Sequence, residues 1–216
     1  MNFKGKKVIV IGFDGASWDG FRAVMDTGRL PHLTELRKRG VYGTLSSTLP
    51  PYTPVAWTTF ATGVNPGRHG VFDFFCKDEE RRGELVDSSD IRSPTLWNIL
   101  SHFGRKCAVV HFPLGYPVEP LNGYMISGFM TPPGRMDTAY PPSFREEVER
   151  ITGGYVMNIE TGALRDCTPE SVASFCRKLK DMTLCREKIL GWLMERKEVD
   201  CLFVVFMMLD KIHHRL

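Results

Sequence analysis

Three short runs of apolar, largely β-branched residues constrain the fold of this chain most strongly. They are Lys7–Gly12, Lys106–Phe112 and Cys201–Met208. Continuous runs of this kind are typical of strands covered on both faces, as in parallel sheets. Segments with helical spacing of apolar residues separate the runs, the longest over Glu170–Lys197. Thr168 is expected to cap this longest helix, and Pro169 to fit its first turn. This alternation predicts an α/β fold with a doubly wound, mostly parallel sheet flanked by helices.

Shorter elements are predicted between these runs. Val41–Leu49 has the pattern of a second strand, and Met125–Gly128 that of another. Pro54–Thr62 is predicted to be a short helix that ends at Gly63. A helix over Ser143–Ile151 is expected to begin with a capping box, because Ser143 is followed three residues later by Glu146. Further helices are expected at Ser17–Thr27, Leu33–Arg39 and Leu96–Phe103, loop at Thr131–Pro142, and a charged turn at Lys77–Gly83.

Composition and charge exclude several classes of protein. The 216 residues carry a net charge of only +3, with basic and acidic residues interspersed, so a nucleic-acid polymer is not an expected partner. The longest apolar run, Cys201–Leu209, is nine residues, whereas a membrane span needs roughly 20. The N-terminal run resembles a signal peptide but is short and interrupted by Asp14. We therefore expect a soluble, cytoplasmic chain with no membrane partner.

The six cysteines are at positions 76, 107, 167, 176, 185 and 201. No two are closer than nine residues, which excludes a zinc ribbon or a thioredoxin-type motif. Most are expected to be buried thiols.

Candidate functional residues follow the predicted strands. In parallel α/β sheets, sites form at the carboxyl ends of strands. Asp14 follows the first strand, Thr53 lies in the loop after the second, and Asp210, His213 and His214 follow the last. Three strand ends therefore carry residues that could hold a metal.

Asp14 and Thr53 each have a simpler structural explanation. Asp14 can hold a divalent cation, but Asp is also a common helix N-cap. Pro54 is expected to open a helix, which makes Thr53 its N-cap. The Thr53 hydroxyl would then lie where helix N–H groups attract an anion, and a metal that lowered its pKa would let it attack phosphorus.

Asp210 and His214 are four residues apart, so both can face one ion across a helical turn. A carboxylate and an imidazole suit Zn²⁺ or Mn²⁺. His213 is expected to point elsewhere, and His69 is expected to fix a compact loop over Gly63–Gly70.

Three segments together resemble a known family. VIVIGFDGAS, PPYTPVAWTTFATGVNPGRHG and FVVFMMLDKIHH, in this order, are similar to segments of the alkaline phosphatase superfamily, and most similar to its type I phosphodiesterase/nucleotide pyrophosphatase branch. The most specific part is Thr53–Gly70. The resemblance implies two divalent metal ions, Zn²⁺ or else Mn²⁺, and a small phosphate ester or nucleotide-like substrate.

The resemblance also implies roles for individual residues. Asp14 matches the first ligand of one ion, Thr53 matches the nucleophile and touches that ion, and Asp210 and His214 match two ligands of the other ion. The implied mechanism is a double in-line displacement, in which Thr53 attacks phosphorus and water then hydrolyses the phosphorylated threonine.

The chain departs from the family pattern in one place near the predicted nucleophile. The family has an Asn that holds a phosphate oxygen where this chain has Phe74, next to Asp73. We treat both residues as candidate substrate-binding residues. Phe72, Phe74 and Phe75 are expected either to line an apolar pocket or, in the simpler interpretation, to pack in the core.

The second departure concerns the end of the sequence. The family completes its metal sites with later Asp and His residues that lie beyond Leu216. We expect residues 1–216 to be the N-terminal part of one catalytic domain, with a small insert or cap at roughly 77–165 and an exposed sheet edge.

The function expected is that of a metal-dependent phosphoester hydrolase. The alternatives are a phosphomutase of the same superfamily and a catalytically incomplete α/β binding module. A sulfatase is disfavoured because Thr53-Pro54-Val55 lacks its signature, and a dinucleotide-binding domain because GFDGAS is not G-x-G-x-x-G.

Overall fold

A computed structural model describes residues 7–77, 79–159, 168–196 and 198–215. It has a five-stranded sheet with the strand order β1-β5-β2-β3-β4, in which only β4 is antiparallel to its neighbour. The strands are β1 (Val8–Phe13), β2 (Cys107–Phe112), β3 (Gly123–Ser127), β4 (Ala139–Tyr140) and β5 (Cys201–Phe206). The predicted α/β architecture is therefore confirmed.

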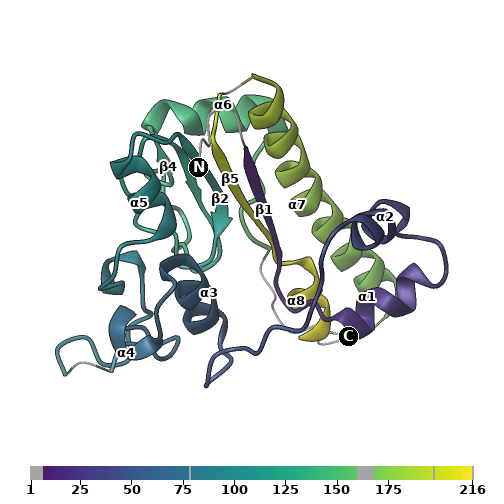
Figure 1. Cartoon of the computed structure of the whole chain (residues 1–216), viewed down its shortest axis with the longest axis horizontal. Helices are drawn as coiled ribbons and strands as arrows, with labels where there is room; N and C mark the ends of the chain where they lie inside the picture. Colours follow the sequence, from purple (N-terminus) through teal and green to yellow (C-terminus); the bar gives the residue numbers. More distant parts are fainter. Residues whose placement is uncertain (1–6, 78, 160–167, 197, 216) are drawn as a thin grey trace.

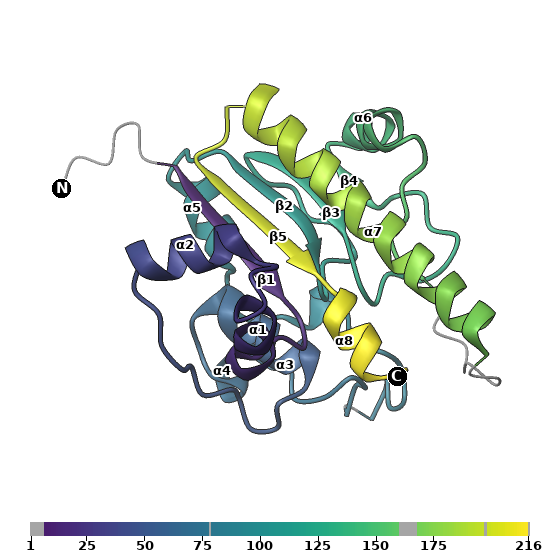
Figure 2. The same ribbon diagram turned by 90° about the vertical axis from the view of Figure 1, so that its right-hand side faces the viewer.

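Helices flank the sheet on both faces (Figures 1 and 2). They are α1 (Trp18–Met25), α2 (Pro31–Arg39), α3 (Thr53–Thr62), α4 (Pro66–His69), α5 (Leu96–His102), α6 (Pro142–Thr152), α7 (Pro169–Arg196) and α8 (Met208–His213). Within the described ranges no helix is both long and apolar enough to span a bilayer.

Alternate residues of the central strands belong to two apolar clusters, one on each face of the sheet. Phe203 of β5 packs with Trp97 of α5, whereas its neighbour Val204 belongs to a cluster with Phe144 of α6 and Ile189 of α7. Because successive side chains of a strand point to opposite faces, both faces of β5 are buried. The apolar runs at β2 and β5 were therefore correct indicators of strands covered on both sides.

The same prediction is wrong for β1. This strand forms where expected, but it lies at an end of the described sheet, and Val8, Ile9, Ile11 and Phe13 are about half exposed. An apolar run favours a strand, but it does not specify which elements cover that strand.

The strand predicted at Val41–Leu49 does not form. This segment is an extended connection between α2 and α3, and no strand among the described residues pairs with it. The Trp18 indole donates a hydrogen bond to the Gly43 carbonyl at 2.9 Å, which ties the segment to α1.

The structure tests the predicted starts of two helices, α6 and α7. Helix α6 begins at Pro142 with Pro141 as its N-cap, so Ser143 lies inside the first turn and the predicted capping box is wrong. At α7 the prediction is confirmed, because the Ser171 N–H donates to the Thr168 hydroxyl at 3.2 Å and Pro169 opens the helix. Residue 197, the predicted end of α7, lies outside the described residues.

Residues 107–140, inside the range 77–165 where a small insert was considered, supply β2, β3 and β4 of the sheet. Among the described cysteines, Cys76, Cys107, Cys185 and Cys201 are buried free thiols and Cys176 is exposed. Cys167 lies outside the described residues.

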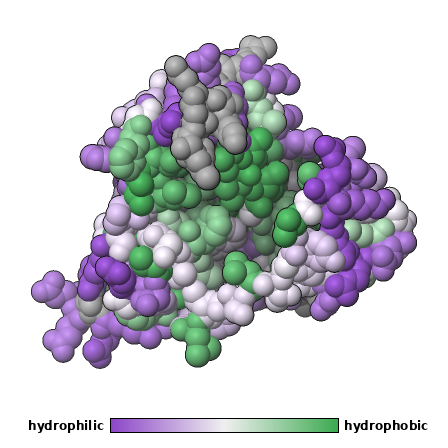
Figure 3. All heavy atoms as spheres, viewed as in Figure 1, coloured by the Kyte–Doolittle hydropathy of each residue, from purple (hydrophilic) through white to green (hydrophobic). Residues whose placement is uncertain are grey.

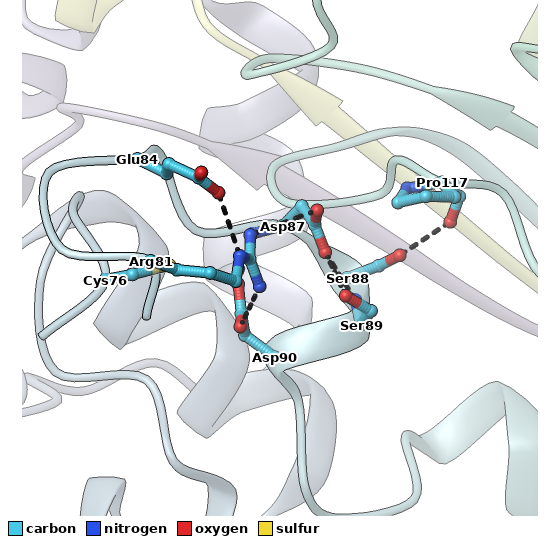
Figure 4. A network of polar contacts seen from close by, with 8 residues as sticks. All are labelled: Cys76, Arg81, Glu84, Asp87, Ser88, Ser89, Asp90 and Pro117. Atoms are coloured by element: carbon cyan, nitrogen blue, oxygen red, sulfur yellow. Dashed lines mark hydrogen bonds and ion pairs between the residues drawn. The ribbon is translucent and has the colours of Figure 1, made fainter. Parts of the chain in front are cut away.

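The charged turn at Lys77–Gly83 belongs to a hairpin closed by a bridge between Phe75 and Leu85. Arg81 organises it (Figure 4): its guanidinium donates to Glu84 Oε2 at 3.0 Å and to Asp90 Oδ1 at 2.7 Å, and lies 3.6 Å from Asp87 Oδ2. These three carboxylates raise the pKa of Arg81 above its ordinary value, the hydrogen bond to Glu84 being the largest cause. Ion pairs to Arg81 and backbone hydrogen bonds, such as that from the Cys76 N–H to the Glu84 carbonyl at 2.8 Å, together fix the turn.

Candidate active site

Asp14 and Asp210 lie side by side because their strands do. β1 and β5 are parallel neighbours, so their carboxyl ends reach the same edge of the sheet. The Asp14 N–H donates to the Phe206 carbonyl at 2.9 Å, and the Asp14 carbonyl accepts from the Asp210 N–H at 3.1 Å. The backbone thus brings together two carboxylates that are 196 positions apart in the sequence.

Gly15 makes this close approach possible. Its φ of 71° lies in the left-handed region, which favours glycine. A Cβ at this position would lie 2.7 Å from both the Cα and the N of Asp210, too close for any side chain without a backbone shift.

Thr53 reaches the same point from a different element. Its Oγ1 is 3.4 Å from Asp14 Oδ2, the distance of a long hydrogen bond. Thr53 is the first residue of α3, and Tyr52 is the N-cap, so the prediction that Thr53 caps the helix is wrong by one position. The hydroxyl still lies in the first turn, where helix N–H groups lack intrahelical acceptors.

Trp57 was not identified from the sequence. Its ring lies against Gly12 of β1, where a Cβ would be only 2.3 Å from Trp57 Cη2. Its side chain also lowers the pKa of the Asp14 carboxyl. Trp57 is four residues after Thr53, so the helical repeat places both on one face of α3. This spacing is the sequence feature that could have identified Trp57 as a neighbour of the site.

The Asp14 carboxyl has a pKa above its ordinary value. Burial is the largest cause, and the nearby Asp210 carboxylate is the second; hydrogen bonds from Trp57, Gly15 and Thr53 oppose them. Two adjacent carboxylates disfavour simultaneous ionisation, and a bound cation would remove that penalty.

His214 contacts Asp210 across the end of α8. Its Nε2 lies 3.3 Å from Asp210 Oδ1, as the four-residue spacing predicted, and its side chain is 76% exposed. His213 is exposed. The sequence analysis also did not identify Lys211, which is buried next to Asp210 in the chain. Its Nζ lies 5.3 Å from the Phe129 ring centre, and burial lowers its pKa.

The aromatic residues near Thr53 divide into two groups. The Phe74 ring is half-buried with its centre 6.0 Å from that of Tyr52, the residue before Thr53. Phe72 and Phe75 are exposed and line a separate cleft of about 310 Å³, so core packing is wrong for these two. Asp73 Oδ1 accepts the Phe74 N–H at 2.7 Å, and Oδ2 pairs with Lys77 at 3.3 Å.

His69 has the structural role predicted for it. It is fully buried, and its Nδ1 accepts the Val71 N–H at 3.2 Å. Nε2 therefore carries the proton and donates to Thr59 Oγ1 at 2.8 Å, which fixes the loop after α3. His111 is buried in β2, whereas His32 and His102 lie exposed on α2 and α5.

The candidate site offers ligands of types that suit a divalent cation, but only a few of them. Asp14, Asp210, Thr53 and His214 offer the carboxylate, hydroxyl and imidazole ligands that Zn²⁺ and Mn²⁺ accept. Across residues 7–77, 79–159, 168–196 and 198–215, however, no three His, Cys, Asp or Glu side chains are grouped closely enough to hold an ion by themselves.

The fold and the site thus define an α/β protein whose mostly parallel sheet places a threonine and two aspartates together at its carboxyl edge. The model of the type I phosphodiesterase/nucleotide pyrophosphatase family matches residues 8–216, and the chain belongs to this family.

Solved structures agree on the fold. Phosphonoacetate hydrolase from Sinorhizobium meliloti 1021 in complex with phosphonoacetate superposes with a TM-score of 0.67 at 16% identity, and the same enzyme with phosphonoformate superposes at 0.65 and 16%. Each match covers 98% of this chain and 48% of the other, so the chain spans about half the length of these structures.

Proposed function

We propose that this chain carries the nucleophile and part of the metal site of a phosphoester hydrolase, with phosphodiester or nucleotide-like substrates. The observation that carries the proposal is the convergence of Thr53 and Asp14, 3.4 Å apart, with Asp210 bonded to the Asp14 backbone. Family membership supports the reaction class.

Thr53 is the proposed nucleophile. Its Oγ would attack phosphorus, the ester oxygen would leave, and water would hydrolyse the phosphothreonine formed. The N–H groups in the first turn of α3 would stabilise the phosphoryl oxygens, helped by the helix dipole. Pro54 offers no N–H, so this contribution comes from its neighbours.

Asp14, Thr53, Asp210 and His214 are the proposed ligands of two divalent cations. Bound there, the cations would supply positive charge that stabilises the attacking and leaving oxygens. Asp14 and Asp210 must be ionised and His214 neutral to act as ligands. Trp57 and Gly15 position the Asp14 carboxylate through the contacts described above.

Phe74 is proposed to form an apolar wall beside the reacting phosphoryl group, together with Tyr52. The Asp73 carboxylate bonds the Phe74 N–H and Lys77, so its proposed contribution to substrate binding is to hold this wall in place.

The decisive experiment uses bis-p-nitrophenyl phosphate and p-nitrophenyl phosphate as reporters. Thr53→Ala is expected to abolish turnover, at least about 1,000-fold, because the nucleophile is removed. Thr62→Ala, the same change at the other end of α3, is the matched control and should retain activity. Activity retained in Thr53→Ala would refute the assignment, and the ratio of the two rates separates diesterase from monoesterase.

The small number of metal ligands among the described residues favours a second candidate function, a binding module of the same fold without catalysis. Metal analysis separates the two: a two-metal hydrolase holds about two Zn²⁺ or Mn²⁺ per chain and loses activity on chelation. A protein that binds no metal would support the module.

A further inference from the structure

Two cysteines lie directly opposite one another on neighbouring strands, at the amino-terminal edge of the sheet. Cys107 begins β2 and Cys201 begins β5, and the two residues are partners in the parallel ladder. Ladder partners direct their side chains to the same face, and both cysteines belong to the apolar cluster that contains Trp97 and Phe203. Two thiols that are 94 positions apart in the sequence are therefore neighbours in the fold.

The amino-terminal edge leaves room beside these thiols. The other ladder partner of Cys107 is Gly123 of β3, which has no side chain. A cleft of about 470 Å³ opens at this edge, and it is lined by Lys106 and Asp200, the residues just before the two cysteines. Cys201 itself is 6% exposed. The cleft therefore gives a small ion a path from solvent to the sulfur atoms.

The distance between the two side chains distinguishes a bound metal ion from a disulfide. Hydrogen-bonded strands lie about 4.8 Å apart, so the Cβ atoms of ladder partners are separated by about that distance. A disulfide needs Cβ atoms about 3.8 Å apart, so the strands would have to move together by about 1 Å. A metal–thiolate bond is about 2.3 Å long, so an ion in line between two sulfurs requires them to be about 4.6 Å apart. The strand spacing meets this second requirement without distortion.

The surroundings of the thiols favour a soft cation with two ligands. Structural Zn²⁺ takes four ligands, and within the described part of the chain no third His, Cys, Asp or Glu side chain joins the pair to form a metal-binding group. Both cysteines are buried in an apolar cluster, and in Figure 3 apolar residues gather over the strands and α5. Thiolates select soft ions such as Cu⁺, which need neither oxygen ligands nor bound water.

We propose that Cys107 and Cys201 bind one soft monovalent cation of the Cu⁺ class, held between two thiolates on β2 and β5. Binding breaks both S–H bonds, forms two metal–sulfur bonds and releases two protons, and the metal keeps its oxidation state. Burial, together with the neighbouring Cys201 and Asp200, raises the pKa of the Cys107 thiol to about 12, so protons compete with the ion. The bound ion links the two strands and stabilises the folded chain.

This site is independent of the proposed phosphoester chemistry. Strand β5 has six residues, so Cys201 lies roughly 17 Å along the strand from Phe206, which marks the carboxyl edge near Asp210. The two proposals can therefore fail separately, because an inactive Thr53 would leave Cu⁺ binding unchanged and a chain without Cu⁺ would keep its hydrolytic site.

The test measures Cu⁺ binding by the full, reduced chain without oxygen, in competition with bicinchoninate. Cys167→Ala and Cys176→Ala in the background remove a thiol outside the described residues and an exposed one. One Cu⁺ per chain is expected, with release of about two protons. Cys107→Ala and Cys201→Ala should each weaken binding at least about 100-fold, because one of two ligands is lost. Cys185→Ala, the matched change at a buried thiol of α7, should not alter the affinity.

A second measurement needs no change at the two thiols. X-ray absorption at the copper edge of the loaded background protein should show two sulfur neighbours at about 2.3 Å and no nitrogen or oxygen neighbour. The melting temperature should also rise by several degrees with Cu⁺ bound. Oxygen or nitrogen at the copper, or unchanged affinity in both Cys107→Ala and Cys201→Ala, would overturn the proposal. So would a disulfide between Cys107 and Cys201 formed with glutathione disulfide in the native protein, since the distance argument excludes it.

Discussion

The contact between Gly15 and Asp210 gives the sharpest prediction about the site. In Gly15→Ala a methyl group would lie 2.7 Å from two backbone atoms of Asp210, in a residue with φ 71°. The left-handed conformation costs a non-glycine residue about 1 kcal/mol, and overpacking against backbone costs about 1–3 kcal/mol more. We expect Gly15→Ala to lower the free energy of unfolding by about 2–4 kcal/mol.

Gly28→Ala is the matched control. Gly28 has nearly the same φ, 74°, but a Cβ there would meet no atom within 4 Å, so only the cost of about 1 kcal/mol should remain. Urea unfolding of both variants, with metal binding measured in parallel, gives the comparison. Gly15→Ala should also weaken metal binding, because it moves Asp210 away from Asp14, and Gly28→Ala should not. Equal unfolding free energies in the two variants would refute the packing argument.

Three further predictions concern charge and hydrogen bonding. Asp14→Asn should raise the melting temperature of chelator-treated protein at pH 7, because a raised pKa means that ionised Asp14 disfavours folding; the gain should vanish below pH 3.8, where wild-type Asp14 is protonated in both states. His69→Ala should cost about 2–4 kcal/mol in urea unfolding by removing a buried ring and leaving Thr59 without its partner, and a cost under about 1 kcal/mol would contradict this role. Arg81→Met should lower the melting temperature through repulsion among the carboxylates around Asp90, and the difference from wild type should shrink in about 1 M salt; a salt-independent difference would point to packing instead.

Local sequence patterns predicted most of the helices and strands, because the residues within each of these elements largely determine whether it forms. The β2 and β5 runs are apolar at nearly every position, as strands buried on both faces require, and the capping of α7 by Thr168 depends on neighbours in sequence. The prediction for β1 was wrong about its surroundings, since the same pattern occurs in a strand whose edge is uncovered. Val41–Leu49 failed for a related reason: a strand depends on its partner as well as on its own residues.

The rule that sites form at the carboxyl ends of parallel strands predicted part of the candidate site correctly. The rule of strand ends correctly placed Asp14 beside Asp210, because β1 and β5 are parallel neighbours. Thr53 reaches them although its predicted strand is absent. The packing of Trp57 against Gly12 sets α3 on β1 and so brings Thr53 within 3.4 Å of Asp14, a long-range contact that sequence spacing alone does not reveal.

The hydrogen bond from the Asp210 N–H to the Asp14 carbonyl has a consequence for redesign of the site. It makes the separation of the two backbone positions that carry the carboxylates a property of the main chain, as fixed as the distance between adjacent strands. Replacing either aspartate by glutamate would thus push a carboxylate outward by one methylene, with no compensating retreat of the backbone. A change in the separation of the two main chains would have to start from the turns after β1 and β5.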